Sequence, residues 1–298
     1  MVSVTHVAAF VIAVLLITTP AQTVGAGPRV DDSVASHIDW STGTLHVTVV
    51  RPIDTESTRS PASISQTQRA IRRDAPRILF PIFAGIQLDS LHTVGSLAAG
   101  HDGLIAGLER AALRALAVDA SASRDLAAAR VTFSIDLYRD LAPELVFHTR
   151  PASIETPLGW VPHTEYTGIL IYAADSLPLF GTGETVRLQP ALFPAVHYLT
   201  SGDGLLYRLA GSAHMDPEHL VSRGPAAYTT DPEAAEVRAR IGEMPLRILA
   251  VAAFGSQPVD IVIAEHDARQ IMASANNRSL LRDGRVVIVV DAARTADE

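Results

Sequence analysis

Residues 285–291 read RVVIVVD, and residues 166–172 read YTGILIY. The first run holds five consecutive apolar residues that are all β-branched, and the second is nearly continuous in apolar residues. Short runs of this kind are typical of strands that are buried on both faces. A strand hides both faces only between layers, so we predict that both runs form interior strands of a sheet covered by other elements.

The sequence around these runs predicts further strands and one helix in the second half. Residues 195–209 surround a glycine-rich turn and are predicted to form a hairpin. Residues 245–254 and 259–264 are predicted to be two more strands. A short helix is expected at residues 265–275, ended by Asn276 and Asn277 in a left-handed cap.

The first half is predicted to follow a β-α-β-α-β order. Leu45, Val47 and Val49 alternate with polar residues, as in a strand with one buried face, and residues 131–137 repeat that pattern. Helices are expected at residues 63–84 and 102–116, with a short extended stretch at residues 86–91 between them. Two prolines inside the first of these predict a kink or two consecutive helices: Pro76 and Pro81.

These elements predict a mixed α+β fold with two small sheets, each covered by helices. Residues 27–150 are expected to form an amino-terminal domain and residues 166–298 a carboxy-terminal domain. Residues 151–165 are rich in proline and are interpreted as the linker between them.

The amino terminus is interpreted as a secretory signal peptide over residues 1–26. Its apolar core, residues 7–17, is too short to span a bilayer, and Val24-Gly25-Ala26 resembles a small-residue cleavage site. A buried strand or helix is the alternative. Cleavage would leave a periplasmic chain that starts at Gly27, and we expect no transmembrane segment after it.

Composition excludes several kinds of chemistry. The 298 residues contain no cysteine, and all 24 basic residues are arginine. Disulfides, thiol nucleophiles, lipidated cysteines, Schiff-base lysines and phosphate-loop lysines are therefore absent. A net charge of −8 argues against nucleic acid as a partner.

The densest group of potential metal ligands is His214, Asp216 and His219. Zinc needs three or four converging ligands, and a spacing of five places two histidines poorly on one helix face. We therefore interpret Asp216 as a helix cap and expect neither a metal nor another cofactor. Other charged residues are interpreted as solvated or capping groups: Arg69, Arg72, Arg73, Arg77, Asp136, Asp140, Glu265 and Asp267.

Between about Ser63 and Asp291 the chain resembles a group of exported bacterial proteins. The resemblance is carried by YTGILI (166–171), LQPALFP (188–194), GLLY (204–207), PLRILA (245–250), VDIVI (259–263), DARQI (267–271) and RVVIVVD (285–291). These are similar to small surface lipoproteins grouped with the flagellar accessory proteins FlgP and FlgT. The resemblance implies a non-catalytic envelope protein that supports flagellar rings or the outer membrane.

The favoured hypothesis is a non-catalytic periplasmic protein that binds other envelope or flagellar proteins, with self-association left open. No catalytic residue is nominated. Two alternatives remain, a periplasmic hydrolase and a small-molecule binding module that uses a cleft between the two halves. A deep cavity with converging polar groups would favour an enzyme, and an unpaired sheet edge would favour assembly.

Overall fold

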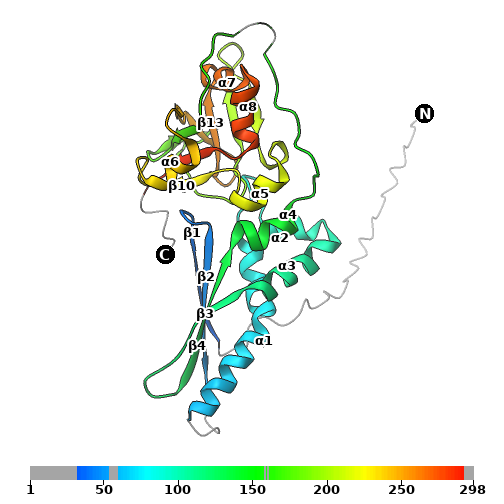
Figure 1. Ribbon diagram of the computed structural model, residues 1–298, viewed down its shortest axis with the longest axis vertical. Helices are drawn as coiled ribbons and strands as arrows, with labels where there is room; N and C mark the ends of the chain where they lie inside the picture. Colours follow the sequence, from blue (N-terminus) through cyan, green and yellow to red (C-terminus); the bar gives the residue numbers. More distant parts are fainter. Residues whose placement is uncertain (1–31, 54–59, 158, 160, 292–298) are drawn as a thin grey trace, which may run out of the picture.

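A computed structural model describes residues 32–53, 60–157, 159 and 161–291. The predicted signal peptide lies outside the described residues. The first half forms the lower part of the molecule and the second half the upper part (Figure 1). Among the described residues, no helix is both long and apolar enough to cross a membrane.

The first half is built on an antiparallel sheet in the order β1-β2-β4-β3. Its strands are Ser33–Asp39, Thr44–Pro52, Leu116–Ala122 and Ala128–Asp136 for β1 to β4. Alternate residues of β2 and β4 are buried, as the sequence predicts, because only one face of the sheet is covered by helices (Figure 1).

Helix α1 (Pro61–Gly85) packs against that face, and α2 (Val94–Ala99) and α3 (Asp102–Arg114) pack against α1. Ser60 begins α1 through a capping box with Ser63. The alternative of two consecutive helices is wrong, because α1 runs through Pro76 and Pro81 without ending. Its buried face supplies the packing that holds the prolines in the helix: Ile64, Ile71, Ala75, Ile78, Leu79 and Phe83.

The predicted β-α-β-α-β order is wrong for this half, which has two strands, three helices and then two strands. Strands β1 and β3 were missed because they lie at the edges of the sheet and are mostly exposed, so they carry no alternating apolar pattern. Leu116, expected on a helix face, is instead 61% exposed at the start of β3. A π-helical turn, η1 (Leu137–Leu141), and α4 (Ala142–Leu145) follow β4.

The second half opens with a wholly parallel sheet in the order β10-β14-β5-β11. These strands are Ala227–Thr229, Val286–Val289, Ile169–Tyr172 and Leu246–Leu249 respectively. The apolar runs at residues 166–172 and 285–291 therefore form interior strands, as predicted. Every residue of β14 is buried, because each side of the strand is paired and each face is covered.

A second four-stranded sheet of this half has the order β12-β13-β8-β9. Its strands are Ala252–Phe254, Asp260–Ala264, Val196–Leu199 and Leu206–Ala210. The chain enters this sheet between Ala250, whose amide donates to Tyr172, and Val251, whose amide donates to Val262. The strand expected at residues 245–254 is therefore two strands, one in each sheet.

Hairpin β8–β9 and strand β13 are confirmed, and a small ribbon of β6 (Leu177–Pro178) and β7 (Thr185–Val186) is added. The mixed α+β class is thus confirmed, whereas the second half has two four-stranded sheets where one was expected. The extra sheet arises because the chain changes its pairing partner between residues 250 and 251, where no glycine or proline marks a break.

Helical elements of this half are η2 (Ser212–His214), α5 (Pro217–Arg223), α6 (Ala235–Ile241), α7 (Glu265–Met272) and α8 (Ala275–Arg282). The left-handed cap at Asn276 and Asn277 is wrong. Ser274 accepts a hydrogen bond from the Asn277 amide at 3.0 Å and so begins α8. The buried Asn277 side chain donates to Thr164 and Gln270.

The two halves share one continuous hydrophobic core. The Trp40 ring, at the β1–β2 turn, meets the Tyr228 ring edge-on at a centroid distance of 5.8 Å. The ring of Tyr138, on η1, lies directly against Gly224, the residue that ends α5. Between Val146 and Gly168, the described residues form no helix or strand.

Gly224 tests this interface. Its φ is +70°, and an added Cβ would lie 2.1 Å from a carbon of the Tyr138 ring. Gly204 has a similar φ of +68° but open space around its Cβ position. We expect Gly204→Ala to lower the free energy of unfolding by ~1 kcal/mol through backbone strain alone. Gly224→Ala should cost ~1–3 kcal/mol more, through the collision and through its extended backbone at ψ 170°, measured by urea denaturation. Equal losses in the two variants would contradict the close contact.

Candidate functional site

The three weak metal candidates are placed by separate local interactions. The Nδ1 atom of His214 accepts a hydrogen bond from the Gly211 amide at 3.2 Å. Asp216 caps α5, because its Oδ1 accepts from the Glu218 amide at 2.9 Å. His219 Nε2 lies 3.9 Å from Asp283 Oδ1. The capping interpretation of Asp216 is confirmed. In the described ranges, no cluster of three or more His, Asp or Glu residues could hold a metal.

The other charged residues from the sequence also have local roles. Asp136 Oδ1 accepts from the amides of Tyr138 and Arg139, and so begins η1. Asp140 Oδ2 accepts from the Asp136 amide at 3.0 Å. The four arginines of α1 are exposed along the helix, as expected for a solvated face: Arg69, Arg72, Arg73 and Arg77.

A buried group of Ser90, His197 and Asp260 has the residue types of a hydrolytic triad. The Ser90 hydroxyl donates to Asp260 Oδ2 at 2.6 Å. His197 Nε2 lies 3.5 Å from the same oxygen and has no hydrogen-bond partner among the described residues. A triad needs the serine bonded to the histidine, which then orients toward the carboxylate. Here the serine bonds to the carboxylate directly, so the group joins the two halves and is not arranged for catalysis.

Strand β3 forms a free edge of the first sheet. It pairs with β4 on one side, and no described strand pairs with it on the other. All seven of its residues are exposed, including Leu116 at 61% and Val118 at 59%. Leu113, at the end of α3 and three residues before β3, is 71% exposed. Leu113 and residues 116–122 are called the β3 edge below.

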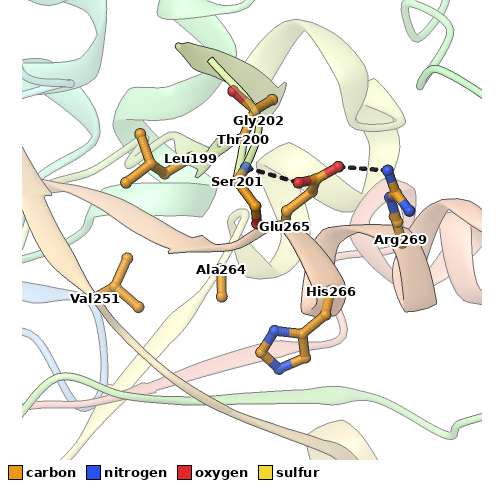
Figure 2. Close-up of a pocket in the computed structure, with 9 residues that line it drawn as sticks. All are labelled: Leu199, Thr200, Ser201, Gly202, Val251, Ala264, Glu265, His266 and Arg269. Carbon is orange, nitrogen blue, oxygen red and sulfur yellow. Dashed lines mark hydrogen bonds and ion pairs between the residues drawn. The ribbon is translucent and has the colours of Figure 1, made fainter. Parts of the chain in front are cut away.

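Two adjoining cavities lie at the carboxyl ends of β8 and β13. The larger encloses about 710 Å³ and is lined by residues 199–202, Val251, residues 264–266 and Arg269 (Figure 2). The smaller encloses about 380 Å³ and is lined by Glu155, Thr156, Pro157, Val161, Tyr198, Thr200, Glu265, Arg269 and Met272. The two share Thr200, Glu265 and Arg269 and are called the β8–β13 cleft below.

The cleft is organised around the carboxylate of Glu265. One oxygen accepts from the Ser201 amide at 2.8 Å and the other from Arg269 at 2.6 Å, and Figure 2 shows His266 turned away from both. The hydrogen bond from the Ser201 amide holds the pKa of Glu265 below its usual range. By contrast, burial raises the pKa of Asp267, the next carboxylate of α7. Glu265 is thus ionised and already paired.

The sequence predicts Glu265 at a helix start, as observed, but does not predict the cleft. Tyr198 and Arg269 come from different segments and reach the cleft only because β8 and β13 pair side by side. The sequence contains one signal of such a site. A glycine-rich turn follows one strand and an acidic helix start follows the other, and ligand sites form at the ends of neighbouring strands. The four cavities described for this chain all lie outside residues 27–150, so none is the expected cleft between the halves.

Fold and cavities together define a two-part α+β protein with an exposed sheet edge below and a polar cleft above. Residues 32–144 match the family model of the N-terminal domain of Treponema pallidum Tp0624. Residues 168–292 match the model of the second domain of the same protein. The chain is thus similar to two successive domains of Tp0624, in the same order. No curated protein matches the chain. Neither model describes FlgP or FlgT, so that resemblance remains a prediction.

His214 gives a pH prediction. Burial, assisted by the nearby charge of Arg208, holds the pKa of His214 below its usual range. The unfolded chain therefore binds more protons than the folded chain below about pH 6.5, and the free energy of unfolding must fall as pH falls. We expect His214→Asn, whose amide oxygen can accept from Gly211, to flatten this decline between pH 7 and 5 in urea denaturation.

The control is His101→Asn, because His101 is exposed before α3 and its ring stacks on Phe147 rather than on a carboxylate. It should leave the wild-type pH dependence unchanged. If His214→Asn also leaves it unchanged, His214 does not contribute to acid sensitivity.

Proposed function

We propose that this protein is a non-catalytic, exported envelope protein that holds a partner protein through the β3 edge. The observation that carries the proposal is that all seven residues of an edge strand are exposed, with two large apolar side chains among them. Unpaired N–H and C=O groups along such an edge bind an extended segment of another chain by adding a strand to the sheet.

The charge on β3 favours a different protein over a second copy as the occupant. Asp119 is the single charged residue of β3 and lies at its centre. Full antiparallel pairing of two β3 strands would place Asp119 opposite Asp119, and directly opposed like charges destabilise a sheet. A partner strand with apolar residues and an arginine or lysine opposite Asp119 fits better. The irregular pairing with β4 between Ala117 and Asp119 also discourages unselective pairing.

The arrangement of Ser90, His197 and Asp260 supports this reading over the hydrolase alternative. These buried side chains bond in an order that does not activate the serine. Among the described cavities, the largest is centred on a carboxylate that is already paired with an arginine. The class of partner, other envelope or flagellar proteins, is proposed from the sequence resemblance of residues 63–291 to exported envelope proteins.

The test is partner capture from envelope extracts with quantitative mass spectrometry. Leu116→Lys combined with Val118→Lys should reduce the captured partner at least tenfold, since two charges replace the apolar contact of the added strand. Leu249→Lys is the matched control, because Leu249 is 71% exposed on β11, an edge strand of another sheet. Circular dichroism should show that all variants fold.

Two results would defeat the proposal. One is capture that is lost equally in the Leu249→Lys control. The other is a partner that remains bound to the Leu116→Lys, Val118→Lys double variant. A wild-type dimer in analytical ultracentrifugation that dissociates in the double variant would show that the occupant is a second copy, contrary to the argument from Asp119.

Export gives a separate prediction about processing. If the signal peptide is removed after Ala26, the protein isolated from its native cells should begin at Gly27, as measured by intact-mass spectrometry. The proposed periplasmic location depends on this cleavage. A natively expressed chain that retains Met1 would exclude it.

A further inference from the structure

We propose that the β8–β13 cleft is a binding site for a neutral oligosaccharide. The inference is independent of the proposed function at the β3 edge, because the two sites lie in different halves of the chain and share no residue.

The topology of the second sheet opens this cleft. Strands β8 and β13 are neighbours and run parallel, so their carboxyl ends lie together. After β8 the chain turns outward to its neighbour β9, whereas after β13 it enters helix α7. Adjacent parallel strands whose connections leave in different directions form a crevice, and ligands of open sheets bind in such crevices.

The polar groups of the cleft suit hydroxyl groups better than a formal charge. Glu265 and Arg269 form an ion pair at 2.6 Å, so their charges largely cancel. Glu155 adds an exposed carboxylate to the smaller cavity, which disfavours an anion and can accept from hydroxyl groups. The Arg269 side chain is 60% exposed and keeps further N–H donors, while the Glu265 oxygens keep further lone pairs. Neighbouring hydroxyls of a sugar can donate to the carboxylate and accept from the guanidinium at the same time.

Tyr198 adds a neutral phenol to the smaller cavity. Burial, together with Glu155, raises its pKa, and its hydroxyl has no hydrogen-bond partner in the described part of the chain. The phenol therefore stays protonated and can both donate and accept. Tyr198 is held in place by stacking on Tyr207, with ring centroids 5.5 Å apart.

Apolar side chains and the volume of the two cavities complete the site. Leu199, Val251 and Met272 line the cleft beside the polar groups and can contact the C–H faces of sugar rings. With about 710 Å³ and 380 Å³ in its two parts, the cleft has room for more than one ring. An amino acid is disfavoured, because a carboxylate bound at Arg269 would lie beside the carboxylate of Glu265, which already neutralises that guanidinium.

Isothermal titration calorimetry with maltotriose, cellotriose and chitotriose tests the site on the full chain. We expect at least one trisaccharide to bind saturably. Tyr198→Phe should weaken that binding about fivefold or more, since it removes only the hydroxyl. Tyr207→Phe is the matched control, because Tyr207 stacks on Tyr198 but does not line either cavity. It should change the affinity less than twofold.

Arg269→Met should weaken binding at least tenfold, with Arg73→Met on α1 as its control. If Arg269→Met does not fold, the two tyrosine variants decide the result.

The inference is overturned if no trisaccharide binds at millimolar concentration, if Tyr198→Phe binds as well as Tyr207→Phe, or if glycylglycine binds and the sugars do not. The Leu116→Lys, Val118→Lys double variant should bind the sugar normally, so failure of either proposal leaves the other standing.

Discussion

The packing of the two halves of this protein depends on the hydrogen bonds that the buried carboxylate of Asp260 accepts. One of its oxygens accepts from the Ser90 hydroxyl of the first half, and the other accepts from the Ala195 amide at 2.9 Å, just before β8. A carboxylate that is 1% exposed is tolerated in a core only when such donors satisfy it. Asp260 begins β13, so it fixes the amino ends of β8 and β13 and holds the first half against them.

The positions of the β8–β13 cleft and of the β3 edge both follow from where the two halves are joined. Fixing the amino ends of β8 and β13 sets their register, and the register places Leu199 beside Ala264 at the carboxyl ends, where the cleft opens. The first half contacts the second through Trp40, Ser90 and Tyr138, none of which lies on β3. Its sheet edge at β3 is therefore left free. One buried group thus supports a polar cleft and leaves an apolar edge exposed elsewhere.

Buried regular elements could be predicted from the sequence, because burial imposes a pattern on it. The alternation at Leu45, Val47 and Val49 and the run at residues 286–290 both report what surrounds a strand in the fold. Strand β3 imposes no such pattern, since every residue is exposed. The change of sheet after Ala250 depends on which strands the amides meet, and that information is not local.

The candidate sites were harder to predict for the same reason. Asp216 was correctly interpreted, because a helix cap is a local interaction between residues two apart. Ser90 and Asp260 are 170 residues apart, and the cleft combines a linker residue, Glu155, with Tyr198 and Arg269. Contacts of this kind are decided by tertiary packing alone.

The connection between the halves lies along the surface of the second half and is held there by hydrogen bonds. The Ala152 amide donates to Ala213, and the Asn277 and Gln270 side chains donate to Thr164 and Pro162. The halves are also joined by a hydrophobic core to which both contribute buried residues. A protease that cuts the exposed stretch at residues 149–150 would therefore leave two fragments bound to each other. The molecule would keep its size on a native gel and show the break only under denaturing conditions.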